Sequence, residues 1–393
     1  MSRRKKIIIS MAIALVLIIA TGAYLYPKEI HMPIRLTYPY DVTISEGNAR
    51  INGYLSAELE IEIPKRIWGA KVDYIDKDAF KSLGTNVVIK SIPEGVIVAE
   101  NMYHQESQSY YRLYMDEAEL IKYVGNEKKV EIPEEVWGHK VTDIGGGEDY
   151  GCFENLEIEE VIIPESVIGI GGNAFKDCKN LKQIDLPSKL EAIGIMSFGG
   201  SGIKSIVLPK SVKKIGSSAF KDSDLEEISG LEDVENIENN PFRGTPWEES
   251  MEGDFVCVNN ILLLYRGSNE EVIVPLTVTE IKGAFSKKEE YLYPLKIKKV
   301  FIPDSVTSIS AYSFWGQEGI EVYIPEAVEL IGDNSSYIDT IFGWYDEVPG
   351  TIVTIAGSPA EAYAKEEKIP CRIITKEEMQ QEMEAAKKRQ EYK

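Results

Sequence analysis

The sequence predicts an α/β solenoid in which mostly short parallel strands, joined by helical turns and interrupted by hairpin insertions, stack coil upon coil. The main observation is a pattern that is written three times between residues 161 and 222. Its prolines, Pro164, Pro187 and Pro209, fall 23 and then 22 residues apart. A fixed period of about 20–30 residues with recurring aliphatic positions is typical of a repeat solenoid.

Each repeat has the same internal order of strand, corner and ring. In the second repeat, Ile184 and Leu186 point the same way from a short strand, because successive side chains alternate across a strand. Pro187 ends this strand, since proline cannot donate to a ladder. Leu190 begins a second inward run, and Phe198 closes the coil with a large ring. The pattern therefore predicts coils whose apolar side chains face the interior.

The free energies of burial and of chain ordering explain why one such coil is not stable alone. About five buried large side chains contribute roughly 1.5–3 kcal/mol each. Ordering about 22 residues costs roughly 1–2 kcal/mol for each residue. A lone coil therefore does not fold, whereas stacked coils share backbone hydrogen bonds and bury both of their flat faces.

The N-terminal segment, residues 1–26, predicts export. Four basic residues at positions 3–6 precede residues 7–26, which carry no charge and are long enough for a transmembrane helix. The basic cluster would stay in the cytosol and place the C-terminal bulk outside. The alternative is a cleaved signal peptide with a core at 7–19 and a mature start at Ala23. Either interpretation places the repeats beyond the membrane.

A longer repeat follows the linker at residues 27–39. Residues 48–75 and 117–144 share one pattern at a period of 69, and each contains a tryptophan before a glycine. We expect Trp68 and Trp137 to cover the edges of their coils, because the following glycines turn the chain. A ligand contact is the alternative. Tyrosines around the intervening polar loop fit either an interface or a strand: Tyr103, Tyr110, Tyr111 and Tyr114.

The repeat continues less regularly after Phe220. Phe198, Phe220 and Phe242 are spaced 22 residues apart, which predicts a ladder of stacked rings. Two apolar runs then flank Asn259 and Asn260, and this arrangement predicts a hairpin with a tight turn. Further coils follow at residues 272–285, 300–314 and 322–331.

Insertions in this part of the chain are the expected sites of partner binding. Residues 286–294 and 333–349 interrupt the coils, and insertions in solenoids loop out of the stack. The two insertions and the neighbouring coil carry tyrosines and tryptophans that could contact a partner. The candidate partner-binding residues are Tyr291, Tyr293, Trp315, Trp344 and Tyr345.

The C-terminal end predicts a cap. Ser358 and Glu361 form a capping box with proline at the first helical position, so a short helix should run to about residue 368. Residues 369–374 predict a last strand, and a charged helix should follow over 375–393. This tail carries only a thin apolar stripe, so a solvated helix is favoured over one that binds a partner.

Composition excludes several functions. The net charge of −21 repels nucleic acid and anionic lipid headgroups. The four cysteines show neither metal-site nor disulfide-framework spacing, so structural thiols are expected. Residues 169–174 match a dinucleotide fingerprint only by letter, since no strand–helix–strand unit surrounds them. We therefore predict no catalytic residues, cofactor or metal.

The run I-x-(I/L)-P-x-x-V-x-x-I-G-x-x-(A/S)-F resembles the BspA-like leucine-rich repeat family, and the resemblance covers roughly residues 40–374. It implies a right-handed curved solenoid on a cell surface, with a protein-binding or adhesive role and no enzymatic activity. The expected partner is a protein or glycan, reached by a membrane-anchored or secreted chain. A purely structural surface protein and an extracellular enzyme are the alternatives.

Overall fold

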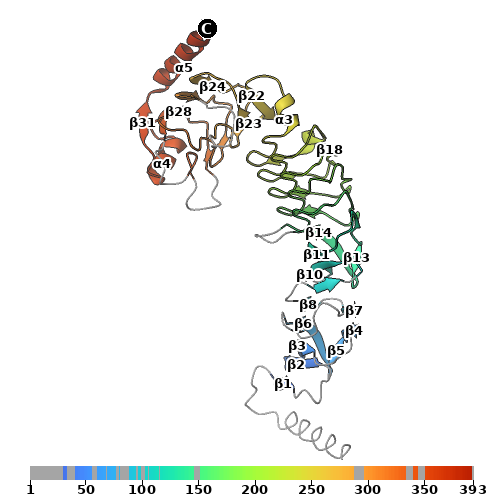
Figure 1. Ribbon diagram of the computed structural model, residues 1–393. Helices are drawn as coiled ribbons and strands as arrows, with labels where there is room; N and C mark the ends of the chain where they lie inside the picture. Colours follow the sequence, from blue (N-terminus) through green and yellow to red (C-terminus); the bar gives the residue numbers. More distant parts are fainter. Residues whose placement is uncertain are drawn as a thin grey trace, which may run out of the picture. The chain divides into compact units, whose positions relative to one another are not determined.

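A computed structural model describes the chain at residues 30–32, 40–54, 60–67, 69–76, 79, 88–93, 96–98, 102–104, 106–114, 116–145, 151–286, 296–332, 340–343 and 350–391. The chain forms two compact units, Met1–Asn101 and Met102–Lys393 (Figure 1). The predicted membrane segment at 7–26 lies outside the described residues. Among those that are described, no helix is long and apolar enough to cross a bilayer.

Unit 1 is built on a hairpin followed by a parallel strand. β2 (Tyr40–Ser45) and β3 (Asn48–Tyr54) are antiparallel, and β3 then pairs in parallel with β6 (Ala70–Ile75). Val42, Ile51 and Val72 are fully buried in its core. The remaining strands are β1 (Ile30–Met32), β4 (Glu60–Glu62), β5 (Arg66–Ile67), β7 (Val88–Ser91) and β8 (Ile97–Val98).

Unit 2 begins with the same module. β10 (Ser109–Tyr114) and β11 (Glu117–Tyr123) form the hairpin, and β11 pairs in parallel with β14 (His139–Ile144). Glu117 lies opposite Lys140, as Asn48 lies opposite Lys71 in unit 1. This shared register confirms the predicted 69-residue repeat. The accompanying strands are β9 (Met102–His104), β12 (Lys129–Glu131) and β13 (Glu135–Val136).

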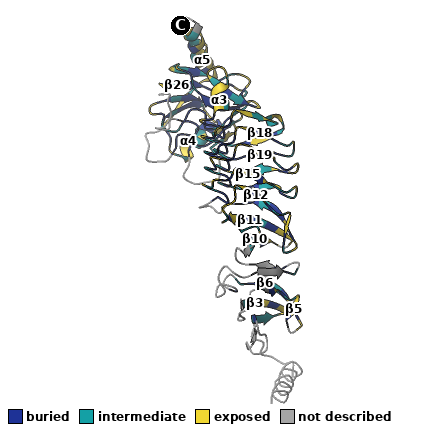
Figure 2. Cartoon of the chain, turned by 45° about the vertical axis from the view of Figure 1, so that its right-hand side comes forward, coloured by how far each residue is buried: buried dark blue, intermediate teal, exposed yellow. Residues whose placement is uncertain are grey.

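The regular coils of residues 151–245, here the N-terminal stack, carry strands on two sides. One side continues in parallel from β14 through β16 (Gly169–Ile170), β17 (Ala192–Ile193), β19 (Lys214–Ile215) and β21 (Asn236–Ile237). The lateral side carries β15 (Glu160–Ile162), β18 (Ser205–Val207) and β20 (Glu227–Ser229). Buried positions line the coil interior, and exposed positions lie at its corners (Figure 2).

The predicted helical turns are wrong for most of this stack, in which non-helical turns join short strands. The segments between its strands are turns whose N–H groups donate to the next coil: Phe175 to Ser197, Phe198 to Ala219, and Phe220 to Pro241, each at 2.7 Å. An α-helix would satisfy those groups within itself. Left-handed residues such as Asn173 and Ser218, with φ of 55° and 57°, aim the backbone outward to the neighbouring coil.

The predicted phenylalanine ladder is confirmed and is longer than expected. Phe198 is stacked between Phe175 and Phe220 at centroid distances of 5.2 and 5.3 Å. Phe153 extends the ladder at one end and Phe242 at the other. Trp247 then meets Phe242 edge-on and ends the row. All five phenylalanines are buried, so the ladder is the axis of this hydrophobic core.

A short insertion separates the two stacks. The 3-10 turn η2 (Leu231–Asp233) lies in the last coil of the N-terminal stack, and α3 (Pro246–Ser250) follows that stack. The Thr245 hydroxyl caps the first turn of α3 by accepting from Glu248 N–H at 3.1 Å. β22 (Phe255–Val258) and β23 (Ile261–Tyr265) then form the predicted hairpin. Asn259 and Asn260 have φ of 49° and 65°, the pair of positive values that a type I′ turn requires.

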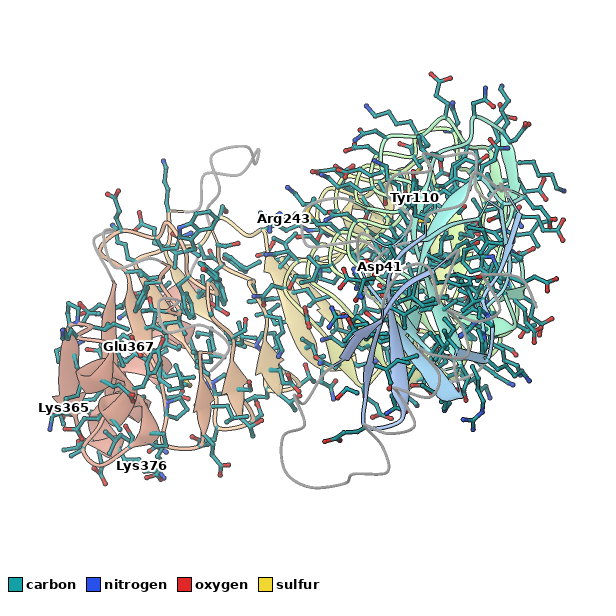
Figure 3. The ribbon with its side chains drawn as sticks, turned by 90° about the horizontal axis from the view of Figure 1, so that it is seen from below. Asp41, Tyr110, Arg243, Lys365, Glu367 and Lys376 are labelled. Carbon is teal, nitrogen blue, oxygen red and sulfur yellow. The ribbon has the colours of Figure 1, made fainter. Side chains whose placement is uncertain are left out.

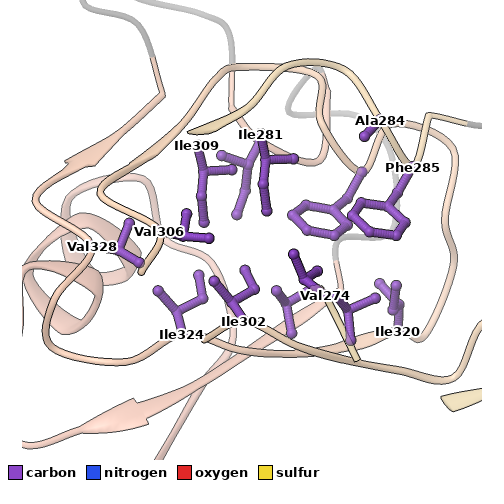
Figure 4. Packing of buried hydrophobic residues seen from close by; sticks show 14 of the residues in the cluster. Val274, Ile281, Ala284, Phe285, Ile302, Val306, Ile309, Ile320, Ile324 and Val328 are labelled. Atoms are coloured by element: carbon purple, nitrogen blue, oxygen red, sulfur yellow. The ribbon is translucent and has the colours of Figure 1, made fainter. Parts of the chain in front are cut away.

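Residues 254–391, here the C-terminal stack, repeat the two-sided coil. β23 continues into β25 (Glu280–Ile281), β27 (Ser308–Ile309) and β29 (Leu330–Ile331). The lateral sheet contains β24 (Glu271–Ile273), β26 (Lys299–Phe301), β28 (Glu321–Tyr323), β30 (Thr351–Ile355) and β31 (Cys371–Ile374). Figure 4 shows Ile281 and Ile309 facing Val274, Ile302 and Ile324 across the core, beside Phe285.

The C-terminal helices differ in how well they were predicted. α4 (Pro359–Glu366) is capped as expected, since Ser358 Oγ accepts from Glu361 N–H at 3.2 Å. α5 (Lys376–Glu391) is also a helix, as expected. The preference for a solvated tail is wrong: Met379 and Ala386 are buried against Phe301 and its neighbours. The thin stripe suffices because its residues meet large side chains on the lateral sheet.

Candidate interaction surfaces

The structure places only one of the five predicted partner-binding residues. Tyr291, Tyr293, Trp344 and Tyr345 lie outside the described residues. Trp315 is half-buried on a turn, where its ring meets that of Tyr312 edge-on at 5.9 Å. A partly covered indole that already has an aromatic neighbour is a modest binding element on its own. The candidate surfaces must therefore be sought on the coils.

The outward-facing residues of the lateral strands form one row, which we call the lateral column. Strand pairing aligns Val207 with Ser229 in the N-terminal stack, and it aligns Phe301 with Tyr323 in the C-terminal stack. Along each strand, the members alternate with residues on the opposite face of the sheet. The lateral column consists of Ile162, Asp185, Val207, Ser229, Ile273, Phe301, Tyr323, Val353 and Arg372.

In the N-terminal stack the lateral column is open. Val207 is 71% exposed and Ile162 is 39% exposed, with the exposed Asp185 on the coil between them. Ion pairs between neighbouring coils flank the column, including Lys204 with Glu226 at 2.5 Å. The result is a mixed surface in which aliphatic side chains stand on a backbone that is fixed by inter-coil hydrogen bonds.

In the C-terminal stack α5 covers the lateral column. Phe301, Tyr323 and Val353 are fully buried beneath Met379 and Ala386. Burial raises the pKa of Tyr323, whose hydroxyl nevertheless keeps polar partners. Its ring is flanked by two cations: Lys299 Nζ lies 5.5 Å and Arg372 Cζ 5.6 Å from the centroid. This face is an internal interface and is not available to a partner.

Ion pairs hold α5 along its length. Lys376 Nζ, at the start of the helix (Figure 3), lies 2.6 Å from Glu326 Oε1. Lys299 Nζ meets Glu382 Oε2 at 3.2 Å near the middle. At the far end, Arg389 binds both carboxylate oxygens of Glu271 at 2.6 and 3.0 Å. The helix therefore reaches from the coil of β28 to the coil of β24.

The hairpin of unit 2 offers a second, polar surface. Arg112 Nη1 lies 3.3 Å from Glu119 Oε2, and the hydroxyl of Tyr114, which is half exposed, lies 3.5 Å from the same oxygen. Burial raises the pKa of Glu119, with Arg112 opposing and Asp143 adding to this effect. Burial also raises the pKa of Asp143. Two partly desolvated carboxylates and an exposed tyrosine thus share one patch.

Two glycines make room for these carboxylates. A Cβ on Gly145 would lie 1.9 Å from Glu119 Oε1, and one on Gly169 would lie 2.4 Å from Asp143 Oδ1. A Cβ at either position would displace the end of the neighbouring carboxylate side chain. The glycines that match a dinucleotide fingerprint therefore include one that accommodates an aspartate.

The aromatic residues beside this hairpin have structural roles. Trp137 is half-buried and packs edge-on against His104 and Tyr111 at 5.1 and 6.2 Å. Tyr111 is fully buried, and burial raises its pKa to about 12. Burial also lowers the pKa of His104. Trp137 thus covers its coil as expected, while Trp68 lies outside the described residues.

Burial raises the pKa of each of the four thiols. All four cysteines are free. Burial raises the pKa of Cys178 to about 12 and holds that of Cys152 well above its ordinary value. The Cys178 thiol donates to the Phe153 carbonyl at 3.0 Å. Within the described part of the chain, no three His, Cys, Asp or Glu side chains are grouped to hold a metal ion.

One surface was missed from the sequence, although a signal for it exists. The lateral column changes from Asp185, Val207 and Ser229 to Phe301, Tyr323 and Val353. Three large apolar residues at consecutive outward positions require a cover. The apolar stripe of Met379, Met383 and Ala386 on the C-terminal helix could supply this cover. Comparing the two sets of residues could have predicted that α5 packs against the solenoid.

Comparison with known proteins agrees with this geometry. Residues 149–251 and 265–340 match the BspA type leucine rich repeat region in six copies. No match was found among the curated proteins.

Solved leucine-rich repeat structures are similar to parts of the chain. One from Bacteroides capillosus ATCC 29799 is 26% identical over 34% of this chain and 96% of that chain, with a TM-score of 0.28. One from Bacteroides ovatus ATCC 8483 is 20% identical over 84% and 70%, with a TM-score of 0.31. A leucine rich cell surface protein from Faecalibacterium prausnitzii A2-165 is 17% identical over 71% and 97%, with a TM-score of 0.31. The coils at residues 149–251 and 265–340 are therefore BspA-type leucine-rich repeats.

Proposed function

We propose that the chain is a non-enzymatic surface protein that binds a protein or glycan ligand through the open faces of its coils. The single observation that carries this proposal is the open lateral column. A valine that is 71% exposed on a strand loses no packing when a partner covers it, and its backbone is already ordered. Rigid exposed apolar groups bind at low entropic cost.

The location is part of the proposal. The basic residues 3–6 and the uncharged residues 7–26 support export, with the repeats outside the membrane. N-terminal sequencing of the mature protein tests how it is held there. A start at Ala23 means a secreted chain, whereas an intact N-terminus in the membrane fraction means a tethered one.

A photo-crosslinking amino acid at position 207 of the full chain tests ligand binding. We expect saturable crosslinks on intact cells that an excess of wild-type chain abolishes. The matched control carries the same amino acid at the exposed Lys365 on α4 (Figure 3), which lies away from the lateral column. A glycan array probed with the same chain covers carbohydrate ligands.

Two outcomes contradict the proposal in different ways. Equal, non-saturable labelling from positions 207 and 365, with no glycan bound, would favour a structural surface protein without a specific ligand. Reproducible hydrolysis by the purified chain that is lost in both Glu119→Gln and Asp143→Asn would instead favour an enzyme.

A further inference from the structure

A cavity of about 410 Å³ lies between α5 and the proline corners of three consecutive coils. We call it the α5 groove. The corners contribute the residues that follow Pro275, Pro303 and Pro325. Six residues form most of its apolar lining: Leu276, Ile302, Pro303, Pro325, Met379 and Met383. Its volume lies within the range of about 300–1,000 Å³ that is usual for ligand pockets.

The apolar lining of the groove is adaptable. Met379 is buried and Met383 is partly buried, and both come from α5. Methionine is unbranched and polarisable, so it moulds itself to apolar groups of different shape. Leu276 stands at the mouth and is 78% exposed, the largest exposure among the large apolar residues of the described chain. An incoming apolar group would therefore meet soft walls and an exposed leucine.

One polar atom in the groove has no internal partner. Ser305 Oγ is buried and makes no hydrogen bond to any described residue. The corresponding serines of other coils bond back to the preceding coil: Ser166 donates to the Val141 carbonyl at 2.7 Å, and Ser211 to the Ser188 carbonyl at 2.9 Å. A buried hydroxyl without a partner costs free energy. Ser305 is partly exposed although its Oγ is covered, so a ligand that displaces this cover and supplies an amide would remove that cost.

The rim of the groove is negative. Asp304, Glu326 and Glu384 line it together with Lys376 and Lys387. Both lysines are already engaged, Lys376 with Glu326 at 2.6 Å and Lys387 with Glu384 at 2.8 Å. Asp304 is exposed and leaves the rim with one excess negative charge. A neighbouring cation on the ligand is therefore favoured over an anion.

We propose that the α5 groove binds a peptide segment of a protein partner, with an aliphatic side chain seated between α5 and the coils and a basic residue beside Asp304. The apolar lining selects the aliphatic group, Ser305 accepts or donates to the main chain, and Asp304 selects the cation. The inference rests on the proposed function, because it assigns a second surface and a ligand class to the same binding protein.

Methyl NMR of the full chain labelled with ¹³C-methyl methionine tests the proposal. The probe is a capped hexapeptide with two central leucines flanked by lysines. We expect saturable shifts of the Met379 and Met383 signals, which Met379→Leu and Met383→Leu assign. Replacing the leucines of the peptide by alanine, or its lysines by glutamate, should weaken binding at least about tenfold, or about 1.4 kcal/mol.

Variants of the rim complete the test without disturbing the core. Leu276→Ser and Asp304→Asn should each weaken the leucine–lysine peptide several-fold, and Val207→Ser, the matched exposed apolar control, should not. Absence of saturable shifts with every peptide, equal affinity for all three, or unchanged binding by Leu276→Ser would overturn the inference. Since crosslinking from position 207 does not depend on the groove, its success beside such a failure would leave the proposed function standing.

Discussion

The two stacks of unit 2 use the same coil but treat their lateral columns differently. In the N-terminal stack the column carries Ile162 and Val207 and is open. In the C-terminal stack it carries Phe301, Tyr323 and Val353 and is covered by α5. The inward residues on either side of Val207, Phe301, Tyr323 and Val353 are all buried. The repeat pattern thus determines the fold of the coil. The lateral-column residue, which varies between repeats, determines whether the outer face of the coil is open or covered by α5.

Both stacks have a row of aromatic rings in the core. The C-terminal stack has its own row, in which Tyr265, Phe285 and Phe314 follow one another at 5.6 and 5.1 Å. The rings of Phe285 and Phe314 are parallel, as in the ladder of the N-terminal stack, whereas those of Tyr265 and Phe285 are tilted by 37°. Differences in binding between the stacks should therefore arise from the surface and not from the interior.

The largest expected effect lies in this shared core. Phe198→Ala should lower the free energy of unfolding by roughly 3–5 kcal/mol, because the cavity opens between two stacked rings that cannot collapse. Urea denaturation measures the change, with the exposed Ile195→Ala as control. A midpoint equal to that of the wild type would mean that the ladder does not bear on stability.

Matched substitutions on the lateral column test the comparison directly. Val353→Ser should cost roughly 2–4 kcal/mol, since it opens a gap under α5 and buries a hydroxyl. Val207→Ser, at the corresponding position of the open part, should change stability by less than about 0.5 kcal/mol. The two unfolding curves decide the matter, and equal costs would refute the distinction between covered and open columns.

The hairpin carboxylates predict a pH effect of smaller size. Burial raises the pKa of Asp143 in the folded chain, so folding takes up a proton above the ordinary aspartate value of about 3.9. The stabilising contribution is present below that value and is lost as pH rises through the raised pKa. Asp143→Asn should therefore raise Tm at neutral pH, and the gain should vanish near about pH 3.5. The exposed Asp185→Asn is the control, and a lower Tm at neutral pH would contradict the prediction.

The smallest effect should come from the end of α5. Arg389→Ala removes the two hydrogen bonds to Glu271, but this pair is exposed and screened by salt. We expect a slight fall in Tm at low ionic strength that high salt removes. Arg372→Ala, which also loses a contact with the Tyr323 ring, should fall further. A salt-independent loss of Tm in Arg389→Ala would contradict the prediction of a screened, exposed pair.

Sequence reasoning succeeded where one residue type has one conformational role. Asn259 and Asn260 predicted a tight hairpin because they tolerate positive φ, and Ser358 predicted a helix start because its oxygen can cap one. It failed for the turns beside Phe175 and Phe198. Their hydrogen bonds join residues about 22 positions apart, whereas helix preference reflects only neighbouring residues in the sequence.

The docking of α5 was missed for a similar reason. Met379 and Ala386 meet residues that lie far back in the chain, such as Phe301, so the pairing appears only when the two stripes are compared. The surfaces were hardest to predict. Of the five aromatic residues chosen, the structure describes only Trp315, and the α5 groove needed both the corner leucine and the position of the helix.

The reach of α5 has a consequence for how the chain comes apart. In a stack held by nearest neighbours, the last coil has one partner and frays first. Here Met379 and Ala386 of α5 pack on Phe301, Tyr323 and Val353, which come from three successive coils, so one helix fastens these coils to one another. Those coils can leave only together. The C-terminal end should therefore melt as one cooperative block, with slow hydrogen exchange where a bare solenoid would open coil by coil.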